Sequence, residues 1–269
     1  MTREFTLTIL SGKNRLGEKE GFDSMEIRPG DTISIVGPTG SGKSAFINDI
    51  ETLAQEDTVT GRTVLVNGDV PPESFIRDPA FKPIALITQN TRCLADLSVE
   101  AFLAMHIKAR RSGKEDILYE TINLANTFTG EKIALNSKMS SLSGGQTRAL
   151  MIADALLISD TPILLLDEIE NAGIFKDKVI QSLQAGNKAV ILVTHDPYLA
   201  VTTGRRIVMR AGGVSSVIEP GDNEKHLIEY LAGIDDRLYQ IREKLRVGAI
   251  FQSGSHEFLA ASIDQGCEL

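Results

Sequence analysis

Cysteine is scarce in this sequence, and so are long apolar runs and positive charge. Two cysteines in 269 residues, Cys93 and Cys267, cannot form a disulfide framework, and they suit a reducing cytoplasm. No apolar run approaches the ~18 residues that a membrane-spanning helix needs, and no secretion signal is evident at the amino terminus. The net charge is −8, from 28 Lys and Arg against 36 Asp and Glu. We therefore expect a cytoplasmic protein that is not a general nucleic-acid binder.

Short apolar segments alternate with segments of helical periodicity along the chain. Strands are predicted at 4–10, 32–36, 63–67, 84–88, 162–167 and 188–193, with a last pair around 206–218. Helices are predicted at 43–55, 98–128 with a break at Gly113, 145–158 and 175–185. The continuous apolar strands 162–167 and 188–193 are typical of a parallel sheet buried on both faces. This alternation predicts an α/β fold, with a helical insert near 91–145.

A glycine-rich loop between strand 32–36 and helix 43–55 reads GPTGSGKS and matches G-x-x-x-x-G-K-[ST] in full. Glycines let backbone N–H groups turn inward toward an anion, and the helix N-terminus adds its positive dipole end. Lys43 can reach the β- and γ-phosphates of a nucleotide, and the Ser44 hydroxyl can bind Mg²⁺. A turn that binds nothing is the alternative, which the strand–loop–helix context disfavours. The candidate phosphate-binding residues are Gly37, Pro38, Thr39, Gly40, Ser41, Gly42, Lys43, Ser44 and Ala45.

The apolar strand at 163–168 ends in two carboxylates, Asp167 and Glu168. The carboxyl end of a buried parallel strand projects side chains at the ligand crevice of an α/β sheet. Asp167 suits a Mg²⁺ ion, and Glu168 can accept a proton from an attacking water. A solvated acidic turn is the alternative interpretation. The phosphate loop upstream favours the catalytic one.

A second glycine motif, LSGGQ at 142–146, opens the predicted helix 145–158. Ser143 is a good N-cap, and the two glycines after it leave N–H groups exposed to an anion. The residues of this second candidate phosphate site are Ser143, Gly144, Gly145 and Gln146. If the two phosphate sites lie far apart, a head-to-tail homodimer would join them, with each loop facing the LSGGQ segment of the other subunit.

These motifs, in this order, resemble those of the ATP-binding cassette (ABC) ATPase family from about residue 4 to about residue 218. The segments that carry the resemblance are GPTGSGKS at 37–44, Gln89 after a strand, LSGGQ, ILLLDE at 163–168, and His195 after strand 188–193. The resemblance implies a P-loop NTPase core with a mixed, mainly parallel sheet, an N-terminal antiparallel β subdomain and an inserted helical subdomain. It implies that Gln89 contacts Mg²⁺ and water, and that His195 binds the γ-phosphate. The implied catalytic set is Glu168, His195, Gln89 and Lys43, and the implied metal ligands are Ser44, Gln89 and Asp167.

We expect three parts in the chain. Residues 1–90 and 146–220 form the ATP-binding core with its antiparallel β subdomain, and 91–145 form the helical subdomain that ends in the LSGGQ signature. Residues 221–269 form a C-terminal helical extension. Within it, 223–246 carry an apolar heptad seam with steps of 4, 3, 4, 3 and 4. Such a helix either folds onto its own core or pairs with another subunit.

Two departures from the family pattern affect the expected chemistry. Ile174 stands where the family has an aspartate in the loop that links the two sites, which predicts weak communication between them unless Glu170 or Asp177 takes that role. The stretch ahead of the phosphate loop, SGKNRLGEKEG, has no aromatic residue to stack on adenine. Apolar contact or Arg15 would then hold the base. Ala45 replaces the common threonine, a mild change.

The resemblance implies an enzyme that binds Mg-ATP at a head-to-tail dimer interface and hydrolyses ATP to drive a conformational change in a partner. The expected role is the ATP-binding subunit of a membrane transporter, held at the inner face of the cell membrane by separate permease subunits. The alternative is a soluble ABC ATPase that remodels or activates a cytoplasmic protein or enzyme complex.

Overall fold

A six-stranded sheet forms the centre of the protein in a computed structural model, which describes residues 5–78, 81–88, 96–110, 116–159 and 161–250. Its strands lie in the order β5 (Ile84–Ile87), β6 (Ile163–Asp167), β7 (Ala189–Val193), β3 (Thr32–Val36), β8 (Arg205–Arg210) and β9 (Gly213–Ile218). All neighbouring pairs are parallel except the β8–β9 hairpin. The carboxyl ends of β3, β6 and β7 therefore meet at one edge, where ligands bind in such sheets.

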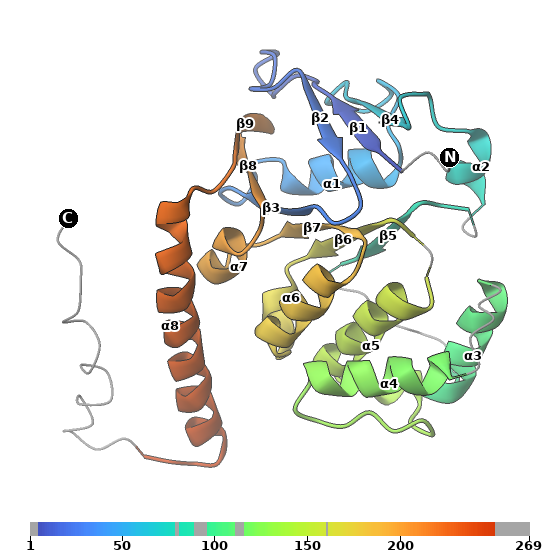
Figure 1. Cartoon of the computed structure of the whole chain (residues 1–269), viewed down its shortest axis with the longest axis vertical. Helices are drawn as coiled ribbons and strands as arrows, with labels where there is room; N and C mark the ends of the chain where they lie inside the picture. The colour runs from blue at the N-terminus through green and yellow to red at the C-terminus, as the bar shows by residue number, and fades with distance from the viewer. Residues whose placement is uncertain (1–4, 79–80, 89–95, 111–115, 160, 251–269) are drawn as a thin grey trace.

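A second, antiparallel sheet lies above the first in Figure 1, with α1 (Lys43–Glu51) between the two sheets. Its order is β2 (Ser24–Ile27), β1 (Leu7–Leu10) and β4 (Thr63–Val66). One hydrophobic cluster joins the inner faces of both sheets to the apolar side of α1, including Phe46 and Ile50. The helix ends four residues before the predicted end at 55. Leu53 there adopts a left-handed conformation with φ 55°, which turns the chain out of the helix.

Helices cover the other face of the large sheet: α3 (Val99–Ala109), α4 (Ile117–Phe128), α5 (Gly144–Leu157) and α6 (Lys176–Ala185). Successive residues of β6 point to opposite faces, so Ile163 joins the cluster with α1 whereas Leu164 joins the cluster with these helices. The short elements are α2 (Glu73–Arg77), α7 (Pro197–Val201) and two 3₁₀ turns, Met139–Ser141 and Ile169–Ala172. The α/β fold with a P-loop core, an antiparallel β subdomain and inserted helices is confirmed. Strand β2 and helices α2 and α7 were not predicted.

The chain continues into a long helix, α8 (Asp222–Arg246), which runs beside α7 and α6 (Figure 1). Among its described side chains none is fully buried. The predicted helix therefore exists, but it does not bury its heptad seam in the core of its own chain. No helix in the described part of the chain combines the length and apolar character needed to cross a bilayer.

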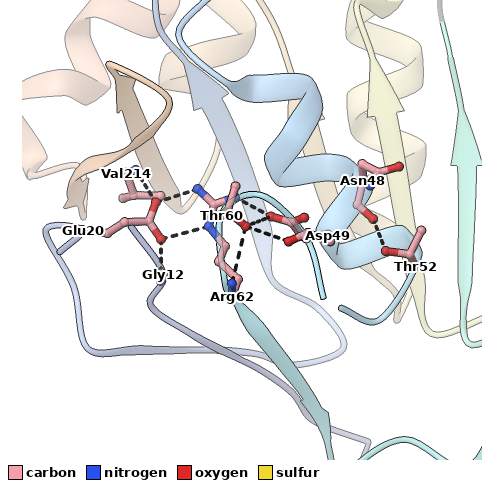
Figure 2. Close-up of polar contacts among 9 residues, drawn as sticks. Gly12, Glu20, Asn48, Asp49, Thr52, Thr60, Arg62 and Val214 are labelled. Carbon is pink, nitrogen blue, oxygen red and sulfur yellow. Dashed lines mark hydrogen bonds and ion pairs between the residues drawn. The ribbon is translucent and has the colours of Figure 1, made fainter. Parts of the chain in front are cut away.

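A fully buried arginine, Arg62, connects the antiparallel sheet to α1 (Figure 2). Its guanidinium donates two hydrogen bonds to Glu20, at 2.9 and 2.6 Å, and a third to Asp49 of α1 at 2.6 Å. The guanidinium also lies 4.7 Å from the ring centre of Phe46. The Thr60 hydroxyl donates to the same oxygen of Asp49. Two carboxylates thus bind one buried cation, and the Asp49 oxygen that accepts from Arg62 also accepts from Thr60.

Glu20 also binds two segments that are distant from each other in the sequence. It accepts hydrogen bonds from the N–H groups of Gly12, at 2.9 Å, and of Val214 in β9, at 2.6 Å. Burial alone would raise the pKa of the Glu20 carboxyl. The hydrogen bonds and charge of Arg62, together with the two backbone N–H donors, outweigh burial and lower that pKa below its usual value. Glu20 is therefore ionised in the folded chain, and its ionised form is the one that the fold stabilises.

We expect Glu20→Gln to destabilise the chain by about 3–5 kcal/mol at pH 7, because it leaves a buried arginine without its main counter-charge. Since the folded pKa is lowered, the wild-type advantage is present at neutral pH and is lost as the pH falls below 4.5 through the folded pKa. Urea unfolding at several pH values measures the difference in the free energy of unfolding between wild type and variant, and we expect that difference to become smaller in acid. Glu26→Gln, in an exposed ion pair with Arg28, is the control and should cost at most about 1 kcal/mol. Equal effects of the two variants would contradict the assigned role of Arg62.

Candidate nucleotide-binding and catalytic site

The phosphate loop connects β3 to α1 and adopts a conformation that requires glycine. Gly37, Gly40 and Gly42 all have positive φ angles, of 153°, 79° and 103°. A Cβ atom at Gly37 would lie 2.5 Å from the carbonyl oxygen of Met209, and one at Gly42 would lie within 2.9 Å of the backbone of Gly212. The N–H of Gly212 also donates to the Ser41 carbonyl at 2.9 Å. The loop is therefore packed against the β8–β9 turn, which fixes its shape.

Two side chains of the loop have the arrangement that a phosphate site needs. The Lys43 ammonium donates to the carbonyls of Gly37, at 2.7 Å, and Pro38, at 3.2 Å, so it lies within the curve of the loop. The buried hydroxyl of Ser41 has no hydrogen-bond partner among the described residues. Ser44, in the first turn of α1, is exposed. An unpartnered hydroxyl and a cation inside a ring of glycines fit a bound phosphate group.

The acidic end of β6 lies beside this loop. Asp167 pairs in register with Val193 of β7, and the Glu168 N–H donates to the Val193 carbonyl at 2.9 Å. Glu168 itself adopts a left-handed conformation, with φ 50° and ψ 54°. An Oε1 atom of Glu168 lies 3.7 Å from Nε2 of His195, which comes two residues after β7. The structure thus brings together Glu168 and His195, which are 27 positions apart in the sequence.

Burial, and then the charges of Glu168 and Glu170, raise the pKa of the Asp167 carboxyl. The charges of Lys43 and Arg148 oppose this rise only in part. The cluster of carboxylates at this strand end therefore carries more negative charge than the neighbouring cations neutralise. A site of this kind fits a divalent cation, because a metal ion would relieve the repulsion among the carboxylates.

Two further charged residues hold the backbone of the site: Arg148, which the sequence did not identify, and Glu170, which was named only as a replacement for the missing loop aspartate. One oxygen of Glu170 accepts hydrogen bonds from the Thr194 hydroxyl, at 2.9 Å, and from the backbone N–H of His195, at 2.8 Å. Arg148 of α5 donates to the carbonyl of Glu168 at 3.2 Å. Glu170 thus fixes the backbone at His195, and Arg148 fixes the backbone at Glu168. The one signal for Arg148 was an arginine on the largely apolar α5, two residues after the LSGGQ segment.

The LSGGQ segment forms the first turn of α5, with Ser143 as N-cap. The Gln146 N–H donates to the Ser143 hydroxyl at 3.3 Å, and the Ser143 N–H donates to the Gln146 side-chain oxygen at 2.9 Å. This capping box occupies the side chain of Gln146 within its own subunit. The N-cap role of Ser143 is confirmed. Gly144 and Gly145 line an open cavity of about 730 Å³ together with Arg148 and Gly173.

The loop after Glu168 uses its side chains within its own subunit. Ile174 is buried, pairs with Thr129 and joins the cluster around the inserted helices. Glu170 binds Thr194 and His195 as described, and burial together with the neighbouring Asp177 carboxylate raises the pKa of the Tyr198 hydroxyl. Both carboxylates considered as replacements for the missing aspartate are therefore engaged inside the chain. In this arrangement neither carboxylate takes the place of the missing aspartate. Weak communication between the two sites stays a prediction.

Two further predicted features concern the metal and the base. Gln89, assigned to the metal and the water, lies outside the described residues, as does Cys93. Beside the phosphate loop, a cavity of about 450 Å³ is lined by Arg15, Gly42, Ala45, Val59 and Gly212. The stem of Arg15 packs on Gly212, where a Cβ would lie 2.5 Å from its Cγ. This cavity opens next to the phosphate loop.

Comparison with known proteins agrees with this geometry. The model of the family described as ABC transporter matches residues 23–171. The uncharacterized ABC transporter ATP-binding protein MJ0121 of Methanocaldococcus jannaschii is 48% identical over 242 residues, which cover 90% of this chain and 93% of the relative. The sn-glycerol-3-phosphate import ATP-binding protein UgpC of Vibrio cholerae is 30% identical, over 92% of this chain and 62% of the relative.

Solved structures share the fold. The ADP conformation of MJ1267, an ATP-binding cassette of an ABC transporter, matches with a TM-score of 0.59 at 20% identity, over 85% of this chain and 96% of that one. A dimeric post-hydrolysis state of the cassette MJ0796 bound to ADP and phosphate matches with a TM-score of 0.59 at 24% identity, over 80% and 99%. With a family match over more than half of its length and a relative at 48% identity over nine-tenths of it, the chain belongs to the ABC transporter family and is an ATP-binding cassette ATPase.

Proposed function

We propose that the chain binds Mg-ATP between its phosphate loop and the signature of a second copy, and that hydrolysis there drives a conformational change in a membrane transporter. The observation that carries this proposal is the 3.7 Å approach of Glu168 to His195 at the strand edge beside the phosphate loop. A carboxylate and an imidazole at that edge can hold a water near the γ-phosphate of a nucleotide bound by Lys43.

In the proposed reaction the water oxygen forms a bond to the γ-phosphorus while the bond from that phosphorus to the β–γ bridging oxygen breaks. Glu168 accepts the proton that the water loses, and ADP leaves with the electrons of the broken bond. His195 donates a hydrogen bond to the γ-phosphate, and its position is held by the hydrogen bond from its backbone to Glu170. Arg148 keeps the backbone at Glu168 in place. Each charged residue at this edge then has a separate task.

Ser44 and Asp167 are the described residues that would hold Mg²⁺, and Gln89 is the proposed third ligand. The carboxylates of Glu168 and Glu170 beside Asp167 support this assignment, because neighbouring negative charge favours a cation there. The metal would neutralise charge on the β- and γ-phosphates. We place the base in the cavity beside the phosphate loop, with the Arg15 guanidinium stacked on it.

The two phosphate sites support a head-to-tail arrangement. Ser143 and the N–H groups of Gly144 and Gly145 open into the 730 Å³ cavity, and in the dimer they would meet the γ-phosphate held by the partner's loop. The division into a core of 1–90 and 146–220, a helical subdomain of 91–145 and an extension of 221–269 is proposed on the same basis. The helical subdomain would carry the signature toward or away from the partner's nucleotide.

We expect Glu168→Gln to lower ATP turnover by ~10²-fold or more, because the group that accepts the proton is removed while the shape is kept. Binding of ATP should be unchanged. Lys43→Ala should instead weaken binding, since it removes the cation that faces the phosphates. Phosphate release and nucleotide titration separate the two effects. The control is Glu73→Gln, in an exposed ion pair on α2, which should change neither. Undiminished phosphate release by Glu168→Gln would contradict the assignment of Glu168 as the proton acceptor.

Asp167→Asn should stabilise the nucleotide-free chain and remove its response to Mg²⁺. The pKa of Asp167 is higher in the folded chain than in the unfolded chain. The stability of the wild type therefore falls as the pH rises from the unfolded pKa through the folded pKa, and the ionised carboxylate is destabilising at pH 7. We expect the melting temperature of the variant to rise by about 2 °C without nucleotide. Mg²⁺ added to ATP should further stabilise the wild type but not the variant. Asp69→Asn, at an exposed turn, is the control. An unchanged Mg²⁺ response would contradict the metal assignment.

The partner is tested by affinity purification of the chain from its native host in detergent. We expect a membrane protein with several spanning helices to co-purify in a fixed ratio, because the related proteins named above belong to transporters. The chain would then lie at the inner face of the membrane through that partner. Recovery of a soluble enzyme complex without a membrane protein would refute the transporter role and favour the alternative, an ATPase that remodels a cytoplasmic complex.

A further inference from the structure

Helix α8 is attached to the rest of the chain by one charged and aromatic face. Glu224 forms an ion pair with Arg206 of β8, and Asp235 accepts a hydrogen bond from Lys176 of α6 at 2.7 Å. Lys176 also binds Asp196, the residue after His195, at 2.5 Å. The ring of Tyr239 meets Phe175 edge-on at a centroid distance of 5.8 Å. Polar contacts and a ring contact thus hold this helix beside the nucleotide site.

A different face of α8 carries the apolar heptad seam. Four of the six seam residues expose more than a third of their surface: Leu227 41%, Ile234 37%, Leu238 45% and Leu245 56%. Each residue of an α-helix advances by about 100°, so Asp235 and Tyr239 lie roughly a quarter to a third of a turn from the line of the seam. The contacts that hold α8 in place therefore do not cover its apolar residues.

The seam has the form of a helix-pairing surface. Leucine and isoleucine repeat with steps of 3 and 4 over three heptads, within a helix of 25 residues that is about 37 Å long. A helix that only covers its own core has a wider apolar stripe, and that stripe is buried. A row of exposed leucines along one line is instead the geometry at which a second helix packs knobs into holes.

The position of α8 favours a second copy of this chain as the partner of the seam. Tyr239, Glu243 and Arg246 of α8 line the same cavity as Ser143 and Gly144 of the signature. The signature belongs to the face that meets the partner subunit in the head-to-tail arrangement. A twofold axis through that face brings the two α8 helices to the same side of the dimer, and identical seams are complementary under such an axis.

We propose that the exposed seam of α8 pairs with α8 of a second copy, and that this contact joins two cassettes without nucleotide. The paired helices would keep the two half-sites at a high effective concentration after ADP and phosphate leave. The next ATP would then close a dimer that is already tethered. The choice of a second copy rests on the proposed head-to-tail arrangement, whereas the proposed catalytic roles do not enter the argument, since it concerns the nucleotide-free chain.

The test compares two lysine substitutions on α8 that differ only in the face they occupy. Leu238→Lys puts a charge into the seam, whereas Gln240→Lys puts the same charge at an exposed position on the other side of the helix. Leucine, glutamine and lysine have similar helix propensities, so neither variant should unfold α8. Light scattering of the nucleotide-free full-length chains, over a wide range of concentrations, gives the dimer dissociation constant.

We expect a concentration-dependent dimer for the wild type and for Gln240→Lys, and a dissociation constant at least about tenfold higher for Leu238→Lys. Leu245→Lys, in the last turn of the helix, should have the same effect, and it guards against a folding defect at 238. Circular dichroism and melting temperature confirm that each variant is folded. A wild type that stays monomeric at every concentration would mean that another partner, such as a helix of a membrane subunit, covers the seam, and would overturn the proposal. So would equal dimerisation of folded Leu238→Lys and Gln240→Lys.

Catalysis provides an independent readout. At low protein concentration, where the tether holds the two copies together, Leu238→Lys should lower the apparent affinity for ATP. At protein concentrations high enough to form the dimer without the tether, its maximal rate of ATP hydrolysis should equal that of the wild type. Loss of the maximal rate at every concentration would point to damage at the nucleotide site instead, and would contradict a role limited to tethering. Glu168→Gln without nucleotide should dimerise as the wild type does, so a failed catalytic assignment and a failed tether give different results.

Discussion

The ion pair between Arg62 and Glu20 is the interaction on which the arrangement of the core depends (Figure 2). It joins the loop before β2, strand β4, helix α1 through Asp49, and β9 through the N–H of Val214. Helix α1 continues directly from the phosphate loop, whereas the other segments are distant from that loop in the sequence. A buried cation costs several kcal/mol unless each of its hydrogen bonds is made, so the segments must meet in one register to satisfy it. The same requirement that makes the network costly also makes it specific to one arrangement.

The position of the phosphate loop follows from that register. Because β9 is held to Glu20 through Val214, the turn between β8 and β9 lies where Gly212 contacts Gly42 and donates to Ser41. Only glycine allows this close approach, since a Cβ at Gly42 would meet the backbone of the turn. The glycines of the motif thus have two tasks. They turn N–H groups inward toward an anion, and they let the loop pack tightly against a turn that the buried ion pair has positioned.

The sequence predicted the elements whose signal is local and missed those that depend on tertiary contacts. The strands β6 and β7 were predicted as continuous apolar runs, and α5 from its N-cap and helical spacing. Strand β2 was not predicted because its sequence, SMEI, has only two buried residues, and the strand forms by pairing with β1. At the site, Glu168 and His195 belong to motifs and were named in advance. Arg148 was not named, and Glu170 was named only as a replacement for the missing aspartate, because a buried charge shows its partner only when the chain is folded.

The two residues that the motifs did not reveal connect the separate parts of the site. Arg148 belongs to the signature helix α5 but binds the carbonyl of Glu168, and Glu170 follows Glu168 but binds the backbone of His195. Helix α5 is therefore hydrogen-bonded to the backbone that carries Glu168, and Glu170 is hydrogen-bonded to the backbone that carries His195. Burial lowers the pKa of the Arg148 guanidinium, and the charges of Glu170, Asp167 and Glu168 oppose that shift. The contact between the signature helix and the strand end therefore places one buried cation beside three carboxylates, and it ties α5 to the end of β6 by a hydrogen bond that neither motif indicated.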